Sequence, residues 1–81
     1  MTSGEFKKLR KFLKLSQKEM AEALGLKRRM IQYYEKGERD GESLDIPKAV
    51  ELACFALAAG VREYTFTAPK NSPKQAEISS L

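Results

Sequence analysis

Two short helix signals joined by one tight turn lie between residues 16 and 37, and they constrain the fold more than any other feature. Residues 16–19, Ser-Gln-Lys-Glu, form a capping box, in which the serine hydroxyl accepts from the third helical amide and the glutamate reaches back. Gly25 supplies the left-handed residue that ends a helix without a Cβ penalty. A second amphipathic helix follows over 27–36 and ends at Gly37. On spacing alone, this segment is either a helix-turn-helix or an ordinary αα-hairpin.

Helix signals also flank this segment on both sides. Apolar residues recur at helical spacing over 5–15, with lysines on the other faces. Asp45 can cap a further helix, Pro47 suits its first turn, and an apolar rhythm continues from there to Gly60. Residues 38–44 are mostly polar and are predicted to be a loop. A chain of 81 residues accommodates one small core, and these signals predict that it is all-α.

The charge of the chain is concentrated in its first half. Fifteen Lys and Arg stand against eleven Asp and Glu, for a formal charge of +4. Residues 1–41 hold eleven of the basic residues and six of the acidic ones. A basic half indicates a polyanionic partner such as nucleic acid, although helical proteins of this size often carry solvated lysine faces as well.

Composition excludes several classes of site. One Cys and no His rule out an internal disulfide, a zinc site of the Cys/His kind and His-based catalysis. We find no nucleophile paired with a base and no phosphate-cradling glycine loop, so we expect no enzyme activity, no metal and no cofactor. Cys54, within an apolar run, is predicted to be a buried thiol in a reducing compartment. No membrane span or signal-peptide core is present in the sequence, and we expect a cytoplasmic protein.

The central segment also carries a family pattern. It contains Leu15-Ser16-Gln17-x-x-Met20-Ala21-x-x-Leu24-Gly25-Leu26, followed by Ile31-x-x-Tyr34-Glu35-x-Gly37. This closely resembles the Cro/repressor-type, or XRE-like, helix-turn-helix family, over roughly residues 6–60. The resemblance implies a lambda-repressor-like bundle of four or five helices, with a DNA-binding domain over 1–61 and its helix-turn-helix at about 16–37. It further implies a homodimer that binds double-stranded DNA at a near-palindromic operator and regulates transcription, most simply as a repressor.

Matching positions imply which residues read the bases. Arg28 and Arg29 match the first outward positions of the recognition helix, where an arginine donates two parallel bonds to guanine O6 and N7. A phosphate contact is the alternative role for either arginine. Gln32, one turn later, can pair with adenine N6 and N7, and Tyr33 can pack on a thymine methyl or bond a phosphate. These four are the predicted base-edge residues.

The resemblance also implies contacts to the DNA backbone. Gln17 begins the first helix of the motif, where the family holds a phosphate with help from the helix amides. The predicted phosphate-binding residues are Gln17, Lys18, Lys27, Lys36 and Arg39. For the last two, a solvated loop is the alternative.

Two further matches concern structure. Arg10 and Glu35 match a pair that links the first helix to the end of the recognition helix through a partly buried ion pair. Lys27 stands where the family usually has Ser or Thr as the N-cap, and lysine cannot accept the amide bond that a cap supplies. We therefore expect a recognition helix that begins with three cations and no side-chain cap.

The last twenty residues, 62–81, are predicted to be a short strand-like segment and a flexible tail. Residues 62–67 alternate polar and apolar side chains, and 68–81 are expected to be disordered. The dimer interface is expected to use helix 46–60, with Tyr64 and Phe66 pairing as a strand across the dimer. One alternative function is an antitoxin-like autoregulator whose tail binds a partner protein, and another is a helical scaffold without DNA affinity.

Overall fold

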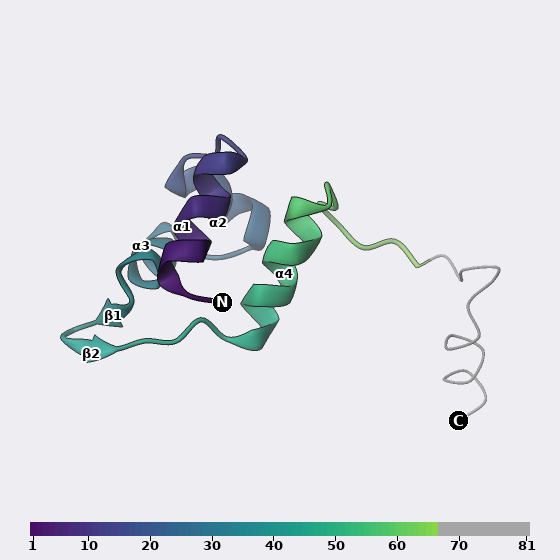
Figure 1. Ribbon diagram of the computed structural model, residues 1–81. Coiled ribbons are helices and arrows are strands. Elements are labelled where there is room, and N and C mark those ends of the chain that lie inside the picture. The colour runs from purple at the N-terminus through teal and green to yellow at the C-terminus, as the bar shows by residue number, and fades with distance from the viewer. Residues whose placement is uncertain (67–81) are drawn as a thin grey trace, which may run out of the picture.

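The computed structural model describes residues 1–66, which form four helices and one small antiparallel sheet (Figure 1). In chain order the elements are α1 (Ser3–Phe12), α2 (Gln17–Leu24), α3 (Arg28–Lys36), β1 (Glu38–Arg39), β2 (Glu42–Ser43) and α4 (Lys48–Ala58). The fold is mostly helical, as predicted. The two-stranded sheet occupies a segment that was predicted to be a loop.

Capping boxes begin both α1 and α2. Ser16 Oγ accepts from the Glu19 amide at 3.0 Å, and the Ser16 amide donates to the Glu19 carboxylate at 2.8 Å. Thr2 and Glu5 form the same reciprocal pair at 3.0 and 2.8 Å. The capping box of α2 was predicted and that of α1 was not. α1 therefore begins two residues before the predicted range, and it also ends three residues before the end of that range. The backbone hydrogen bond from Thr2 lowers the pKa of Glu5 below its ordinary value, and that from Ser16 does the same for Glu19.

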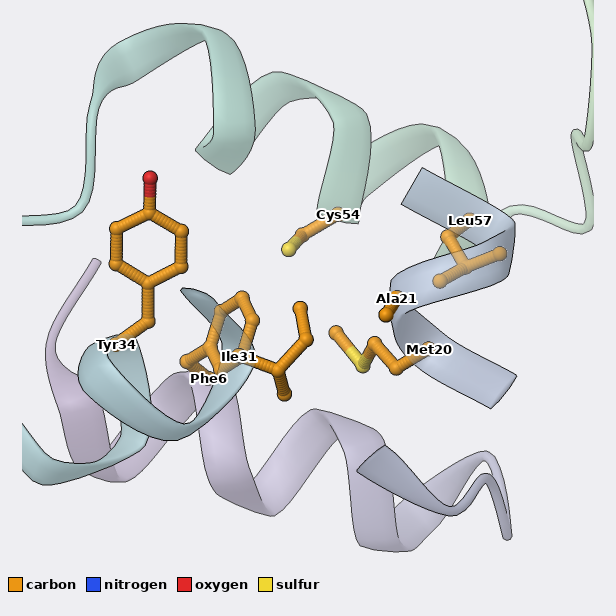
Figure 2. Close-up of a cluster of buried hydrophobic side chains, with 7 residues drawn as sticks. All are labelled: Phe6, Met20, Ala21, Ile31, Tyr34, Cys54 and Leu57. Carbon is orange, nitrogen blue, oxygen red and sulfur yellow. The ribbon is translucent and has the colours of Figure 1, made fainter. Parts of the chain in front are cut away.

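Seven buried side chains from all four helices form the core (Figure 2). They are Phe6, Met20, Ala21, Ile31, Tyr34, Cys54 and Leu57. The rings of Phe6 and Tyr34 meet edge to face, with centroids 5.7 Å apart. Cys54 points from α4 into this cluster and is fully buried, as predicted, and its burial raises the pKa of the thiol. The core therefore joins α1 and α4 to the α2–α3 pair.

Residues 38–43 form a tight hairpin. Glu38 pairs with Ser43 and Arg39 with Glu42, and the two turn residues between them, Asp40 and Gly41, have φ of 53° and 82°. Positive φ at both central positions is the geometry that an Asp-Gly pair favours, because it matches the twist of the flanking strands. The prediction of a loop was wrong here because it overlooked that dipeptide.

The start of α4 also differs from the prediction. Its N-cap is Pro47, with no side-chain hydrogen bond to the helix, and Asp45 lies two residues earlier and does not cap it. Since proline has no side-chain acceptor, α4 depends on tertiary burial of Cys54 and Leu57 more than on its own first turn.

Residues 61–66 follow α4 as an extension without helix or strand. The predicted strand-like segment over 62–67 does not form within the described part of a single chain, because a strand requires a neighbour to pair with its amides. Tyr64 and Phe66 are exposed there. The rest of the predicted tail lies outside the described residues. None of the helices within residues 1–66 is long and apolar enough to cross a membrane.

The capping boxes predict a loss of stability in acid. Because Glu5 and Glu19 bind a proton more weakly when folded, the stability they contribute is present above their ordinary pKa of 4.5 and is lost as the pH falls through their lower folded values. We expect the melting temperature to fall between about pH 5 and pH 3, and to fall less in Glu5→Gln/Glu19→Gln. Circular dichroism melts measure this.

Glu22→Gln is the control, since Glu22 is an exposed glutamate of α2 outside the boxes. If the melting temperature of the double variant depends on pH as that of the wild type and the control does, the capping boxes are not the cause of the loss of stability in acid.

Candidate nucleic-acid interface

α2 and α3 pack through the core and leave one side of α3 free. Ile31 and Tyr34 of α3 are buried, whereas Arg28, Arg29 and Gln32 are exposed. At 3.6 residues per turn, Arg28, Arg29 and Gln32 occupy one side of α3 and the buried residues another, with Arg28 nearest the buried side. The predicted base-reading residues thus share one helix face. Tyr33 lies at the edge of this face and is only partly exposed.

The start of α3 is cationic and uncapped. Lys27 is its N-cap residue and makes no side-chain hydrogen bond to the helix, in line with the expectation for lysine at this position. Lys27, Arg28 and Arg29 are all exposed. Helix amides without an intrahelical partner and three side-chain cations therefore lie together at this end of α3.

A partly buried ion pair fixes α3 against α1. Arg10 donates through Nε and Nη2 to the two carboxylate oxygens of Glu35, the latter at 3.1 Å, and through Nη1 to the Leu15 carbonyl at 3.0 Å. The Arg10 and Glu35 side chains are only 12% and 6% exposed. The side-chain hydrogen bond to Glu35 raises the pKa of Arg10, so the guanidinium stays charged. One guanidinium therefore connects α1, α3 and the turn that precedes α2.

Hydrogen bonds extend from this ion pair to the exposed face of α3. Gln17 Nε2 donates to Glu35 Oε1, and Gln32 Nε2 donates to Gln17 Oε1, each at 3.4 Å. The network brings a predicted phosphate-binding residue and a predicted base-reading residue together with the ion pair. Sequence reasoning missed this link because its members lie 15 and 18 positions apart and leave no local pattern.

The remaining predicted phosphate-binding residues, Lys36, Arg39 and Lys18, are placed differently from one another. Arg39 lies over the Tyr33 ring, with Cζ 5.2 Å from the ring centroid, and its Nε is 3.9 Å from Asp40 Oδ2. Lys36 Nζ is 3.4 Å from Glu38 Oε1. Both cations have an acidic neighbour, whereas Lys18, exposed at the start of α2, has no ion-pair partner among residues 1–66.

The described part of the chain does not meet the requirements of a metal site. Residues 1–66 hold no group of three His, Cys, Asp or Glu side chains that could bind a metal ion. The side chains described above are suited instead to an extended anionic surface, with hydrogen-bond donors on one helix and cations around it.

A helix-turn-helix family model, HTH_3, matches residues 6–53, which is more than half of the chain. The chain therefore belongs to this XRE-type helix-turn-helix family, a family of DNA-binding transcription regulators. Comparison with curated proteins and with solved structures gave no match.

Removing one partner of this partly buried ion pair should destabilise the fold. In Arg10→Ala the Glu35 side chain loses its partner in a site that is only 6% exposed, which typically costs about 3–5 kcal/mol. We expect a loss of this size in urea denaturation, before any specific loss of DNA binding. Arg10→Met/Glu35→Leu removes both charges and should recover most of the stability. A loss below about 1 kcal/mol in Arg10→Ala would show that the pair is as weak as an exposed one.

Proposed function

We propose that this protein is a dimeric, sequence-specific repressor that places α3 in the major groove of its operator. The observation that supports this most directly is the exposed face of α3, where Arg28, Arg29 and Gln32 lie on a different side from the residues that anchor the helix in the core. Rigid anchoring matters because base recognition depends on donors held in a fixed position.

Each residue on this face has a role in the proposal. Arg28 and Arg29 donate paired hydrogen bonds to guanine O6 and N7. Gln32 uses one amide hydrogen on Gln17, which leaves its carbonyl oxygen and its second N–H for the N6 and N7 atoms of adenine. Tyr33, held by Arg39, lies at the edge and suits a thymine methyl or a phosphate.

Backbone contacts would fix the register of α3 on the duplex. Gln17 is suited to bind a phosphate at the start of α2, because its amide is held by Glu35 and retains a second N–H. Lys18 is exposed next to Gln17, and Lys27 is exposed at the start of α3. These contacts add affinity for any sequence, while the α3 face supplies discrimination.

The proposed dimer uses the outer side of α4. Leu52 and Phe55 are 61% and 76% exposed on that helix, and Tyr64 and Phe66 are exposed in the segment that follows. Large apolar side chains grouped on one element mark an interaction surface. Two copies joined there would present two α3 helices to the two halves of a near-palindromic operator.

The antitoxin-like alternative rests on Tyr64 and Phe66. Exposed aromatic residues suit the docking of a different protein as well as of a second copy. A partner protein that co-purifies with the wild type and is lost from Tyr64→Ser/Phe66→Ser would favour that function, with DNA binding serving autoregulation.

Selection of bound sites from a random duplex library tests the proposed function. We expect enrichment of an inverted repeat whose half-sites are centred about 10 bp apart. Binding of the selected site should be tighter than that of random DNA at two salt concentrations. Salt-sensitive binding without enrichment would show that the protein holds phosphates and does not read sequence.

Arg29→Ala should change specificity as well as affinity. We expect a loss of about 1–3 kcal/mol on the selected operator and a relaxed preference at one base position. The matched control is Lys18→Ala, which should weaken operator and random DNA alike. Equal losses on both DNAs for Arg29→Ala would make this arginine a phosphate contact.

Leu52→Lys/Phe55→Lys should convert the dimer to a monomer. The two charges would be buried without partners at the proposed interface, which opposes association. Analytical ultracentrifugation measures the change, and circular dichroism checks the fold. Glu22→Lys, an exposed change on α2, is the control. A double variant that stays dimeric would place the interface elsewhere.

A further inference from the structure

The charges on two segments that flank the recognition helix are opposite in sign. Residues 7–18, which form most of α1 and the start of α2, contain six basic residues and no acidic one. Residues 36–45, which include the hairpin, contain four acidic residues and two basic ones. The two cations of the second segment each have an acidic neighbour, as described above. The hairpin side of α3 therefore carries a net negative charge, which disfavours phosphates.

α1 lies beside the C-terminal end of α3 (Figure 1). A Cβ built on Gly37 would lie 2.9 Å from Ser3 Oγ, so the start of α1 touches the residue that ends α3. Two turns further along α1, Arg10 binds Glu35. These two contacts define the stripe of α1 that faces the end of α3.

Three lysines continue along this stripe or next to it, and we call them the α1 lysine row: Lys7, Lys11 and Lys14. Lys7 lies four positions after Ser3 and three before Arg10, and so on the same stripe. Lys11 follows Lys7 by four positions. Lys14 comes two residues after the end of α1. All three lysines are exposed, and none forms an ion pair with any of residues 1–66.

We propose that the α1 lysine row binds DNA phosphates beside the C-terminal end of α3, a contact that the acidic hairpin cannot supply. This inference rests on the proposed DNA-binding function and extends its surface to a helix outside the helix-turn-helix. Gln17 and Arg10 connect the two regions, because both bind Glu35. The row therefore continues the phosphate-binding surface that begins at Gln17 and Lys18.

The alternative role of these lysines is local. Arg10 and Lys11 lie in the last turn of α1, where cations stabilise the helix dipole. That role affects the melting temperature of the free protein and has no dependence on DNA. A phosphate contact instead changes how steeply binding falls with salt, because each contact releases a condensed counterion. The two roles are therefore separable by experiment.

The test measures the salt dependence of binding for single Lys→Gln variants, on the selected operator and on random duplex DNA. Lys8→Gln is the matched control: it removes the same charge from the same helix, but Lys8 lies on the side that carries Glu5 and Phe12. We expect Lys7→Gln and Lys11→Gln each to reduce the slope of log K against log salt by about 0.9, on both DNAs. Lys8→Gln should leave the slope unchanged.

Two further variants sharpen the comparison. Lys7→Arg keeps the charge and should keep the wild-type slope, and Lys36→Gln should change the slope less than Lys7→Gln does. Unchanged melting temperatures would show that the fold is intact.

Failure of this inference is distinct from failure of the function it rests on. If the wild type binds its operator but Lys7→Gln and Lys11→Gln behave like Lys8→Gln, the α1 lysine row does not contact phosphates. If Lys36→Gln reduces the slope and Lys7→Gln does not, the backbone contact belongs to the hairpin side. If the wild type shows no duplex binding at either salt concentration, the proposed function fails and this inference fails with it.

Discussion

The partly buried, bidentate ion pair between Arg10 and Glu35 is the contact on which the arrangement of the other elements depends. The pair connects α1 to α3. Arg10 also donates a hydrogen bond to the Leu15 carbonyl, just before α2, and Glu35 accepts one from the side-chain amide of Gln17. A charge pair in this environment contributes to stability through complete hydrogen bonding more than through Coulomb attraction. Each hydrogen bond to the ion pair consequently helps to orient the segment that makes it. The ion pair thus orients Gln17 and, through it, Gln32.

The parts of the fold that sequence reasoning predicted correctly are those with a local cause. The capping box at Ser16 and the left-handed residues Gly25 and Gly37 set both ends of α2 and the end of α3. The Asp40-Gly41 turn was equally local and was overlooked. The start of α4 was predicted wrongly because two signals competed, and Pro47 took the cap position that Asp45 was expected to fill.

The candidate site could be predicted less fully from the sequence, because much of its geometry depends on contacts between residues that are distant in the chain. The helical period places Arg28, Arg29 and Gln32 on one face of α3, so the face itself follows from the sequence. The bond between Gln32 and Gln17, and the position of Arg39 over Tyr33, depend on how separate elements pack. Which cations are free and which have acidic neighbours likewise depends on tertiary packing. A sequence therefore identifies the residues that can meet DNA, whereas the fold decides how each is oriented.

In the proposed complex with DNA, the uneven charge around α3 would affect discrimination as well as affinity. Phosphate contacts bind every sequence equally, so each one strengthens competing sites together with the operator. Acidic residues beside the end of α3, at Glu38, Asp40 and Glu42, oppose that non-specific binding. Lys27 has the converse effect at the start of α3, where a missing cap costs about 1 kcal/mol and adds a cation near the groove. Cations lie at the start of α3 and acids near its end, an arrangement that would orient the helix on the duplex in the proposed complex as well as attract it.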